Sequence, residues 1–456
     1  MKQFKPVLAM FIALAVATPA LAFNVEWHGD LNNRFSYSTQ ADTSVRVSKD
    51  SEKYIGFGGV DYSLAVLPSI DFNKNENDSD FFGEIKYRMH LVASDEEQKI
   101  KGVVGFEFGS AKFGENDEAP FGGDKNNFEL RWAYTDLALP FDPASRLAVG
   151  LMPVGYNDFV WTDNAAGVKW YRKEGNLAYS LGWFRDDWGN PDDAGGDKKS
   201  QYDDAYAGDV TYVFENGSAL NAFVIYLDQG QEDLVGLLGG AGPQNIQDQE
   251  MWLGLSGKGK WGNLSGMATA IYLTGEAKIA DEDLDRKAYL LHAQGDYKMD
   301  KFTFTLGGLY ASGDDDNADG DLENFDHIDI STSILGSVVI FDNYADDNSL
   351  SQAFYVTDKG YKIIYAGVKY ALNDKTDVWG KYFWHNTAED MEYVAGESED
   401  EIGHEFVVGA SYKIMKGVSA DINAGYLVAG DALDQLSSGL DADDVFRTDA
   451  RIQFKF

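Results

Sequence analysis

Long segments of this chain alternate apolar and polar residues with a period of two. In residues 23–38, FNVEWHGDLNNRFSYS, apolar side chains occupy every second position over most of the segment, with charged and polar residues between them. Residues 81–91, FFGEIKYRMHL, and residues 127–136, NFELRWAYTD, repeat the pattern, the last with Trp132 and Tyr134 on the apolar face. Successive side chains of a β-strand point to opposite faces, so each segment predicts a strand with one apolar and one charged face.

A β-barrel in a membrane explains strands with one apolar and one charged face. A soluble sandwich buries its apolar faces against a second sheet and rarely sets ionised groups along the opposite face of long strands. In a membrane, hydrocarbon surrounds the outside of a barrel, water fills the inside, and closure leaves no edge unpaired. We therefore predict an all-β fold, a transmembrane antiparallel up-and-down β-barrel.

The amino-terminal end predicts export. Two lysines precede an apolar stretch that is shorter than the ~20 residues a spanning helix needs, and a small-residue ALA motif follows it. We expect a signal peptide over residues 1–22 and a single barrel domain over residues 23–456. The chain has no cysteine, so strand pairing and burial, not disulfides, must hold the exported domain together.

The connections between expected strands alternate between tight turns, such as Asn216-Gly217, and long acidic stretches, such as residues 313–360. Outer-membrane barrels have this asymmetry, with short turns at the periplasmic rim and long loops outside. We expect about eighteen strands, with sixteen possible and with residues 54–67 as an alternative hairpin inside the first loop. The expected strands centre near Trp27, Lys86, Phe106, Trp132, Ala148, Trp170, Leu181, Val210, Val224, Leu253, Met267, Leu291, Phe304, Ala366, Trp379, Val408, Ile422 and Ile452.

The charge balance is strongly acidic. The chain carries 75 Asp and Glu against 38 Lys and Arg, a formal charge of −37. Such a surface repels a polyanion, so nucleic acid is excluded as a partner. Most of the acids fall in the long connections, where they would surround the outer mouth of a barrel.

The last twelve residues, VFRTDARIQFKF, alternate throughout and end on an aromatic ring at Phe456. Terminal residues of soluble sheets usually fray. A large ring at the terminal carboxylate therefore points to lipid or to a binding partner.

The chain resembles the bacterial outer-membrane general porins, in particular the homotrimeric porins of sulfate-reducing bacteria. The resemblance rests on the signal peptide, the terminal strand and the block FELRWAYTDLALPFDPASRLAVGLMPVGYNDFVWTDNAAGVKWY, residues 128–171. It implies a water-filled channel for passive diffusion of small hydrophilic solutes and ions, in the outer membrane of a Gram-negative bacterium.

The same resemblance implies partners. They are two further copies of the chain in a homotrimer, outer-membrane lipid and lipopolysaccharide, and the barrel-assembly machinery, which would read Phe456 as an assembly signal. The expected trimer contact uses the outer faces of the first and last strands. Its named residues are Val25, Leu31, Ala450 and Ile452.

A constriction inside the barrel is also implied. In trimeric porins an inward arginine on one strand is followed by a second strand and by a loop that folds into the lumen. Here Arg131 matches that arginine, residues 146–151 match the second strand and residues 152–164 match the inward loop. The loop is shorter than in the best-known general porins, and PFGGD at residues 120–124 precedes the strand instead of lying in the loop.

An eyelet of this kind sets acids on the loop across water from bases on the wall. The loop offers Asp158 and Asp163. The wall offers Arg34, Lys86, Arg88, Arg131, Lys169 and Arg447. For each residue taken singly, a local salt bridge or a solvated lumen charge is the alternative interpretation.

A second group of candidates lies in residues 315–326, DDNADGDLENFD, whose acids have the spacing of a calcium loop. The candidate ligands are Asp315, Asn317, Asp319, Asp321, Glu323 and Asp326. No helices are expected to flank this stretch, its last position is Asp instead of Glu, and a solvated acidic loop is the alternative. We expect no required cofactor, with Ca²⁺ in an outer loop as the one candidate ion.

Signs of catalysis are weak. Six histidines are scattered without a zinc motif, and no GxSxG elbow, P-loop or dinucleotide fingerprint stands between a strand and a helix. We expect a channel and not an enzyme. Two alternatives stay open, a channel selective for sugars or anions, and a structural or adhesive surface barrel with a plugged lumen.

Overall fold

The computed structural model describes twelve parts of the chain, namely residues 23–39, 79–114, 128–187, 202–233, 245–279, 282–316, 319–330, 335–341, 344, 359–392, 398–436 and 442–456. The expected signal peptide and the alternative hairpin at residues 54–67 lie outside these residues. Within the described helices, none is long and apolar enough to cross a membrane.

Eighteen long strands make up the wall in the described part of the chain. They are β1 (Phe23–Ser38), β2 (Asp80–Asp95), β3 (Ile100–Lys112), β4 (Phe128–Leu139), β5 (Asp142–Asn157), β6 (Trp161–Glu174), β7 (Leu177–Asp187), β8 (Tyr202–Val213), β9 (Ala219–Asp233), β10 (Asn245–Trp261), β11 (Leu264–Ile279), β12 (Glu282–Met299), β13 (Phe302–Ala311), β16 (Tyr361–Asn373), β17 (Thr376–Met391), β18 (Glu399–Met415), β19 (Val418–Ala429) and β20 (Val445–Lys455). Three short elements accompany them, β14 (Asp321–Leu322), β15 (Asp329–Ile330) and α4 (Asp431–Leu436). Every expected strand centre lies in one of the long strands, which confirms the predicted fold and the count of eighteen.

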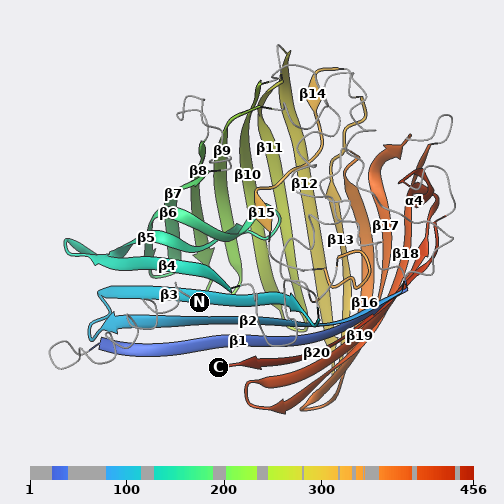
Figure 1. The fold of residues 1–456 in the computed structure, drawn as a ribbon, viewed down its shortest axis with the longest axis horizontal. Helices are drawn as coiled ribbons and strands as arrows, with labels where there is room; N and C mark the ends of the chain where they lie inside the picture. Colours follow the sequence, from blue (N-terminus) through green and yellow to red (C-terminus); the bar gives the residue numbers. More distant parts are fainter. Residues whose placement is uncertain are drawn as a thin grey trace.

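The sheet closes on itself. Each long strand pairs antiparallel with the next along the chain, and β13 pairs with β16 across the longest connection. β1 pairs with β2 on one side and with β20 on the other, from Asp30 opposite Lys455 to Ser38 opposite Arg447. Every long strand described therefore has two neighbours, and the barrel is complete (Figure 1).

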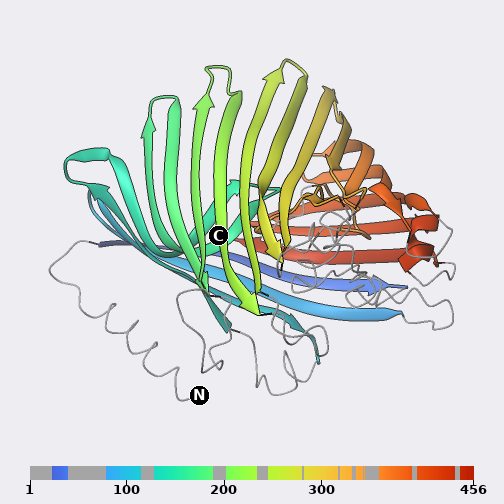
Figure 2. The same ribbon diagram turned by 90° about the horizontal axis from the view of Figure 1, so that it is seen from above.

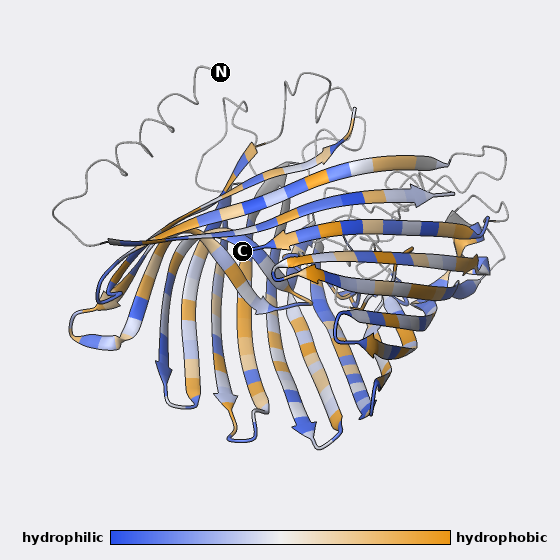
Figure 3. Ribbon diagram, turned by 90° about the horizontal axis from the view of Figure 1, so that it is seen from below, coloured by the Kyte–Doolittle hydropathy of each residue, from blue (hydrophilic) through white to orange (hydrophobic). Residues whose placement is uncertain are grey.

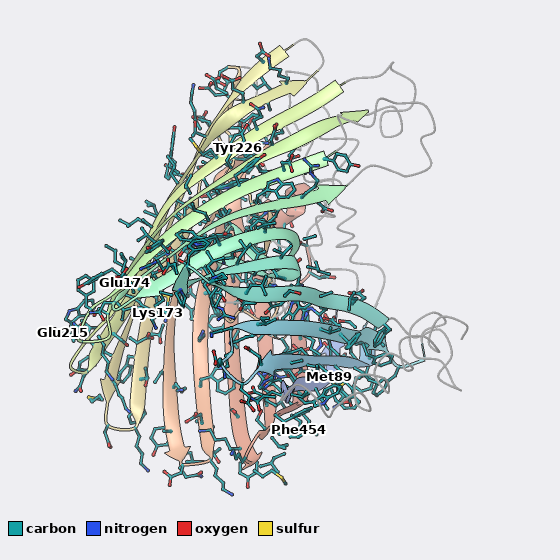
Figure 4. The ribbon with its side chains drawn as sticks, turned by 90° about the vertical axis from the view of Figure 1, so that its left-hand side faces the viewer. Met89, Lys173, Glu174, Glu215, Tyr226 and Phe454 are labelled. Carbon is teal, nitrogen blue, oxygen red and sulfur yellow. The ribbon has the colours of Figure 1, made fainter. Side chains whose placement is uncertain are left out.

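One rim of the barrel carries the tight turns, as predicted. Eight connections at this rim, from β2–β3 to β18–β19, are no longer than the five residues between β8 and β9 (Figure 2). Glycines at residues 175, 217, 262 and 417 take positive φ values there, a conformation that costs other residues more. Lys173, Glu174 and Glu215 lie at this rim (Figure 4).

The two faces of the wall differ as the alternation predicts (Figure 3). In β1, Val25 is 55% exposed on the outside whereas Arg34 is 8% exposed on the inside. In β18, Val408 is 63% exposed whereas Glu405 is fully buried. Exposed apolar residues recur on the outer face of strands around the barrel, which is the arrangement that hydrocarbon favours.

A bulge in β4 corrects one predicted face. The pairing of β3 with β4 skips Arg131, and an extra residue in one strand resets the alternation by one position. Trp132 and Tyr134, expected on the outer face, therefore turn inward. Trp132 donates a hydrogen bond to Asn164, and Tyr134 packs against the buried core.

The seam between β1 and β20 depends on the carboxyl-terminal residue. Phe456 exchanges two backbone hydrogen bonds with Gly29, at 3.0 and 3.1 Å, and its ring covers the position that a side chain at Gly29 would occupy. The ring remains 47% exposed on the outer face. Phe456 is thus a structural part of the closure as well as an outward-facing ring.

We expect Gly29→Val to weaken this seam. A Cβ at Gly29 would lie 2.5 Å from the Phe456 ring, so the ring or the strand must move, at a cost of ~1–3 kcal/mol. Urea unfolding in lipid vesicles, followed by the heat-modifiable band, measures the loss. Gly295→Val is the matched control because a Cβ there meets nothing within 4 Å; equal losses in the two variants would contradict the prediction.

Candidate pore constriction

The hairpin formed by β5 and β6 leaves the wall and enters the lumen. β4 pairs with β5 only as far as Leu151, and β7 pairs with β6 only from Gly167. Residues 152–157 and 161–165 pair with each other in a β-ladder, and none of the described wall strands continues that ladder. The hairpin therefore projects inward beyond its neighbours.

The tip of this hairpin reaches the far side of the barrel. Asn157 donates a 3.1 Å hydrogen bond to Ser256 of β10, and the ring centroids of Phe159 and His292 of β12 lie 5.0 Å apart. Residues 152–164 were expected as a loop, and they are instead a β-hairpin with a short turn. The alternating buried residues of the hairpin explain why it is regular, since they pack as a strand face does.

Two further segments, residues 325–330 and 335–341, also lie inside the barrel. Both belong to the connection between β13 and β16. β15, within the first segment, pairs in parallel with the start of β6 (Figure 1), and Trp252 of β10 donates a 2.9 Å hydrogen bond to the carbonyl of Asp326. The apolar side chains of the second segment are almost completely buried.

These inward segments correct a second expectation. Residues 313–360 were expected as an outer loop because the stretch is acidic, yet the described parts at residues 325–330 and 335–341 fold into the lumen. The sequence does carry a sign of this, the apolar run ILGSVVIF at residues 334–341. A loop in water gains nothing from such a run.

Four of the predicted bases gather on the inner faces of β1, β2 and β4. Arg34 pairs with Glu84 at 3.0 Å. Glu107 of β3 pairs with three bases, at 2.6, 3.3 and 3.5 Å, in the order Arg88, Arg131 and Lys86. We call Arg34, Lys86, Arg88 and Arg131 the basic wall, and in the described part of the chain these bases pair with the carboxylates of Glu84 and Glu107.

One predicted acid faces the basic wall. Asp163, on the inward hairpin, interacts electrostatically with Arg131 and with Asp329 of β15. The side chains of Arg88 and Arg131 retain 20% and 14% exposure, more than Arg34 and Lys86. The predicted pair of an inward acid and a wall arginine is therefore brought together.

Two other predicted residues lie elsewhere. Asp158 stands at the hairpin tip, where burial raises its pKa and Lys258 of β10 opposes the rise. Lys169 lies 4.8 Å from the centre of the Tyr156 ring, below the inward hairpin. These two residues do not join the basic wall.

Arg447 extends the positive surface onto β20, where it pairs with Asp449 at 3.3 Å. A neighbour that we did not include among the candidates, Arg451, pairs with Asp421 at 3.3 Å and lies 4.2 Å from the centre of the Tyr344 ring. The alternation of the terminal strand places Arg451 on the inner face, so the sequence alone could have identified it as a lumen base.

A cavity of about 990 Å³ opens below the inward segments, on the side of the tight turns. Gly336 of the inward segment lines it from above. Its charged and aromatic lining consists of Lys260, Asp296, Lys298, Asp300, Lys369, Trp379 and Lys381. Sequence reasoning missed this cavity because its residues come from six strands, two turns and the inward segment.

The described candidates for calcium do not form a metal-binding group of three or more side chains, and Asn317 lies outside the described residues. Asp321 forms a 2.7 Å salt bridge with Lys287, and Asp326 lies beside His327, with Arg286 within electrostatic range. Burial raises the pKa of Glu323, and nearby carboxylates reinforce the rise. The calcium site stays a prediction.

The comparison with protein families gives one partial match. A family model described as "Alginate export" matches residues 215–439, a little under half of the chain. Comparison with the curated proteins gives no match.

Solved structures with this fold include three bacterial proteins. OpdL of Pseudomonas aeruginosa is 12% identical with a TM-score of 0.56, over 95% of this chain and 99% of its own. OccK9 (OpdG) of the same organism is 11% identical with a TM-score of 0.56, over 95% and 98%. OccAB4 of Acinetobacter baumannii is 13% identical with a TM-score of 0.52, over 95% and 98%. The chain therefore has the fold of a transmembrane 18-stranded outer-membrane barrel.

We expect Glu107→Gln to favour anions. The substitution removes the one carboxylate that faces three bases, so the potential of the lumen becomes more positive. The chloride-to-potassium permeability ratio should rise about two- to fivefold, equivalent to ~0.5–1 kcal/mol. The reversal potential across a salt gradient measures it. Glu174→Gln, the same charge change at the rim of tight turns, should leave the ratio unaltered, and an equal shift in both variants would exclude a local effect.

Proposed function

We propose that the protein is an outer-membrane porin, a water-filled channel for passive diffusion of small hydrophilic solutes and ions. The observation that carries the proposal is the closed barrel whose outer face is apolar and whose inner face bears charges around a partly filled lumen. An inner face built from ion pairs and hydroxyls suits water and polar solutes. Its narrowed interior suits size selection.

The same observation supports a location in the outer membrane of a Gram-negative bacterium. Eighteen strands with tight turns at one rim suit insertion from the periplasm, with the turns left on that side. Outer-membrane lipid and lipopolysaccharide would then contact the exposed apolar residues. The barrel-assembly machinery would read the terminal strand with Phe456.

A selective channel for anionic solutes is the second candidate. The basic wall favours it, because Arg88 and Arg131 lie in the lumen, where both pair with Glu107. The matching family is described as "Alginate export", and one neighbour, OpdK of Pseudomonas aeruginosa, has a crystal structure with vanillate. Alginate and vanillate both carry carboxylates, the groups that arginine binds best.

The trimer implied by the resemblance to porins of sulfate-reducing bacteria remains part of the proposal. A groove of about 350 Å³ on the outer face of β18–β20 and β1 supports it in part, since Ala450 and Ile452 of the expected contact line the groove beside Phe35 and Tyr412, whereas Val25 and Leu31 do not. Its apolar lining of small and large residues suits a second copy of the chain.

We expect the wall bases Arg88 and Arg131 and the hairpin acids Asp158 and Asp163 to act on ion selectivity in opposite directions. At low salt the acidic mouth should give a modest cation preference that weakens as salt rises, because mouth charges are screened over ~8 Å at physiological salt. Neutralising Arg88 and Arg131 together should increase cation preference, whereas neutralising Asp158 and Asp163 should decrease it. Single-channel reversal potentials at two mean salt concentrations provide the test. A barrel that never conducts would overturn the channel itself, and an anion preference that ignores both pairs would place the eyelet elsewhere.

Oligomerisation gives a separate expectation. Ala450→Trp fills the outer groove, so cross-linking in native membranes should yield less trimer than in the wild type. Ala270→Trp, on the outer face of β11, is the matched control because it adds the same ring far from the groove. Monomer alone in the wild type would contradict the trimer.

A further inference from the structure

One buried carboxylate holds the inward segment at residues 335–341. Glu405 lies on the inner face of β18 and is fully buried. Its Oε1 accepts the backbone N–H groups of Val338 at 2.7 Å and Val339 at 2.9 Å. Its Oε2 accepts the hydroxyl of Ser337 at 2.6 Å. Three donors of the segment therefore converge on a single side chain.

The wall supplies the fourth donor. Nε2 of His385 on β17 lies 3.2 Å from Oε2 of Glu405, and its Nδ1 is hydrogen-bonded to the hydroxyl of Tyr361. With the proton on Nε2, His385 donates to Glu405 and accepts from Tyr361. A carboxylate has about four acceptor positions, so the four donors match its capacity. Such a fully bonded buried carboxylate is a strong and specific attachment.

Gly425 of β19 leaves the space in which the segment at residues 335–341 packs against the wall. A Cβ on Gly425 of β19 would lie 2.9 Å from Cβ of Val338 and 3.1 Å from Cγ2 of Val339. It would also lie 3.1 Å from Oε1 of Glu405. Any larger residue at position 425 therefore crowds the segment at the place where Glu405 binds it. The steric fit at Gly425 and the hydrogen bonds of Glu405 therefore fix the segment at the same place on the wall.

The other inward segment, residues 325–330, is attached differently. Ile328 donates a 2.9 Å backbone hydrogen bond to Val160 at the hairpin tip, and β15 pairs with β6. Trp252 binds the carbonyl of Asp326. These attachments come from backbone pairing and from an indole, and none of them uses Glu405. Among the described residues, the two segments therefore have different hydrogen-bonded attachments, although their apolar side chains belong to one buried cluster.

The segment at residues 335–341 lies over the open part of the lumen. Gly336 lines the 990 Å³ cavity, and Lys381, which also lines it, donates a 2.9 Å hydrogen bond to the carbonyl of Leu335. We propose that Glu405 is the positioning residue that holds residues 335–341 across the lumen and thereby sets the cross-section of the channel. Loss of its carboxylate releases this segment and leaves residues 325–330 in place.

Thiol labelling tests the release without any need for conduction. The chain has no cysteine, so Val338→Cys and Phe325→Cys each introduce a single thiol, and both positions are fully buried. Glu405→Ala should raise the labelling rate at position 338 at least about tenfold, because the hydrogen bonds to a charged group are lost. The rate at position 325 should stay as it is. Heat-modifiability of each variant confirms that the barrel is closed.

Conductance provides the second measurement, and this readout alone rests on the proposed channel function. Glu405→Ala should raise the single-channel conductance about twofold, since current follows the open cross-section. Gly425→Val should also raise the conductance, because its side chain displaces the segment sterically while every charge is kept. Asp136→Ala is the control, because it removes a buried inward carboxylate that bonds Arg146 and Tyr171 instead of the segment.

The outcomes separate the two proposals. Faster labelling at position 338 alone supports the positioning role, and a barrel that then fails to conduct refutes only the channel. Faster labelling at both positions shows that Glu405 supports the whole interior, which overturns the specific role. Unchanged labelling at position 338 in both Glu405→Ala and Gly425→Val overturns it as well.

Discussion

Backbone hydrogen bonding in a medium without water is the constraint on which the rest of this structure depends. An open sheet edge in hydrocarbon leaves N–H and C=O groups unpaired at several kcal/mol each. The pairing of β1 with β20 removes the last such edge, and Phe456 continues that pairing to Gly29. Because the strand count is even, the first strand starts and the last strand ends at the same rim. Every connection at that rim is a tight turn, whereas the long connections fall at the other rim, together with the short β5–β6 and β11–β12 connections.

Closure with eighteen strands creates an interior that the wall residues cannot fill by themselves, since side chains fill a barrel of about eight strands. The chain fills part of it with the hairpin at residues 152–166 and the segments at residues 325–330 and 335–341. The apolar core therefore lies inside the barrel, under these segments. Each inserted segment brings backbone groups that must be satisfied away from water, and β6, Trp252 and Glu405 satisfy many of them.

The sequence predicted the wall much better than the interior, for a physical reason. The alternation of apolar and polar residues depends on the local surroundings of each strand, so all eighteen predicted strand centres were correct. The predicted faces were wrong in β4, where the bulge at Arg131 shifts the alternation by one residue. The course of residues 313–360 depends on contacts with distant strands, and their overall acidity concealed the apolar run at residues 334–341. Arg131 and Asp163 were identified through a family resemblance. Glu107 was overlooked as an organising residue because carboxylates are common in this chain.

The net charge of −37 is consequently a poor guide to what the lumen favours. If the acids of the long connections surround the mouth as the sequence predicts, water and salt screen them from the constriction within about one Debye length. Charges in the basic wall lie within 2.6–3.5 Å of their partners, in surroundings where screening is weaker. In the proposed channel, a solute would therefore respond first to the bases that pair with Glu107. The geometry of a few buried ion pairs, and not the composition of the chain, determines the field that the solute meets.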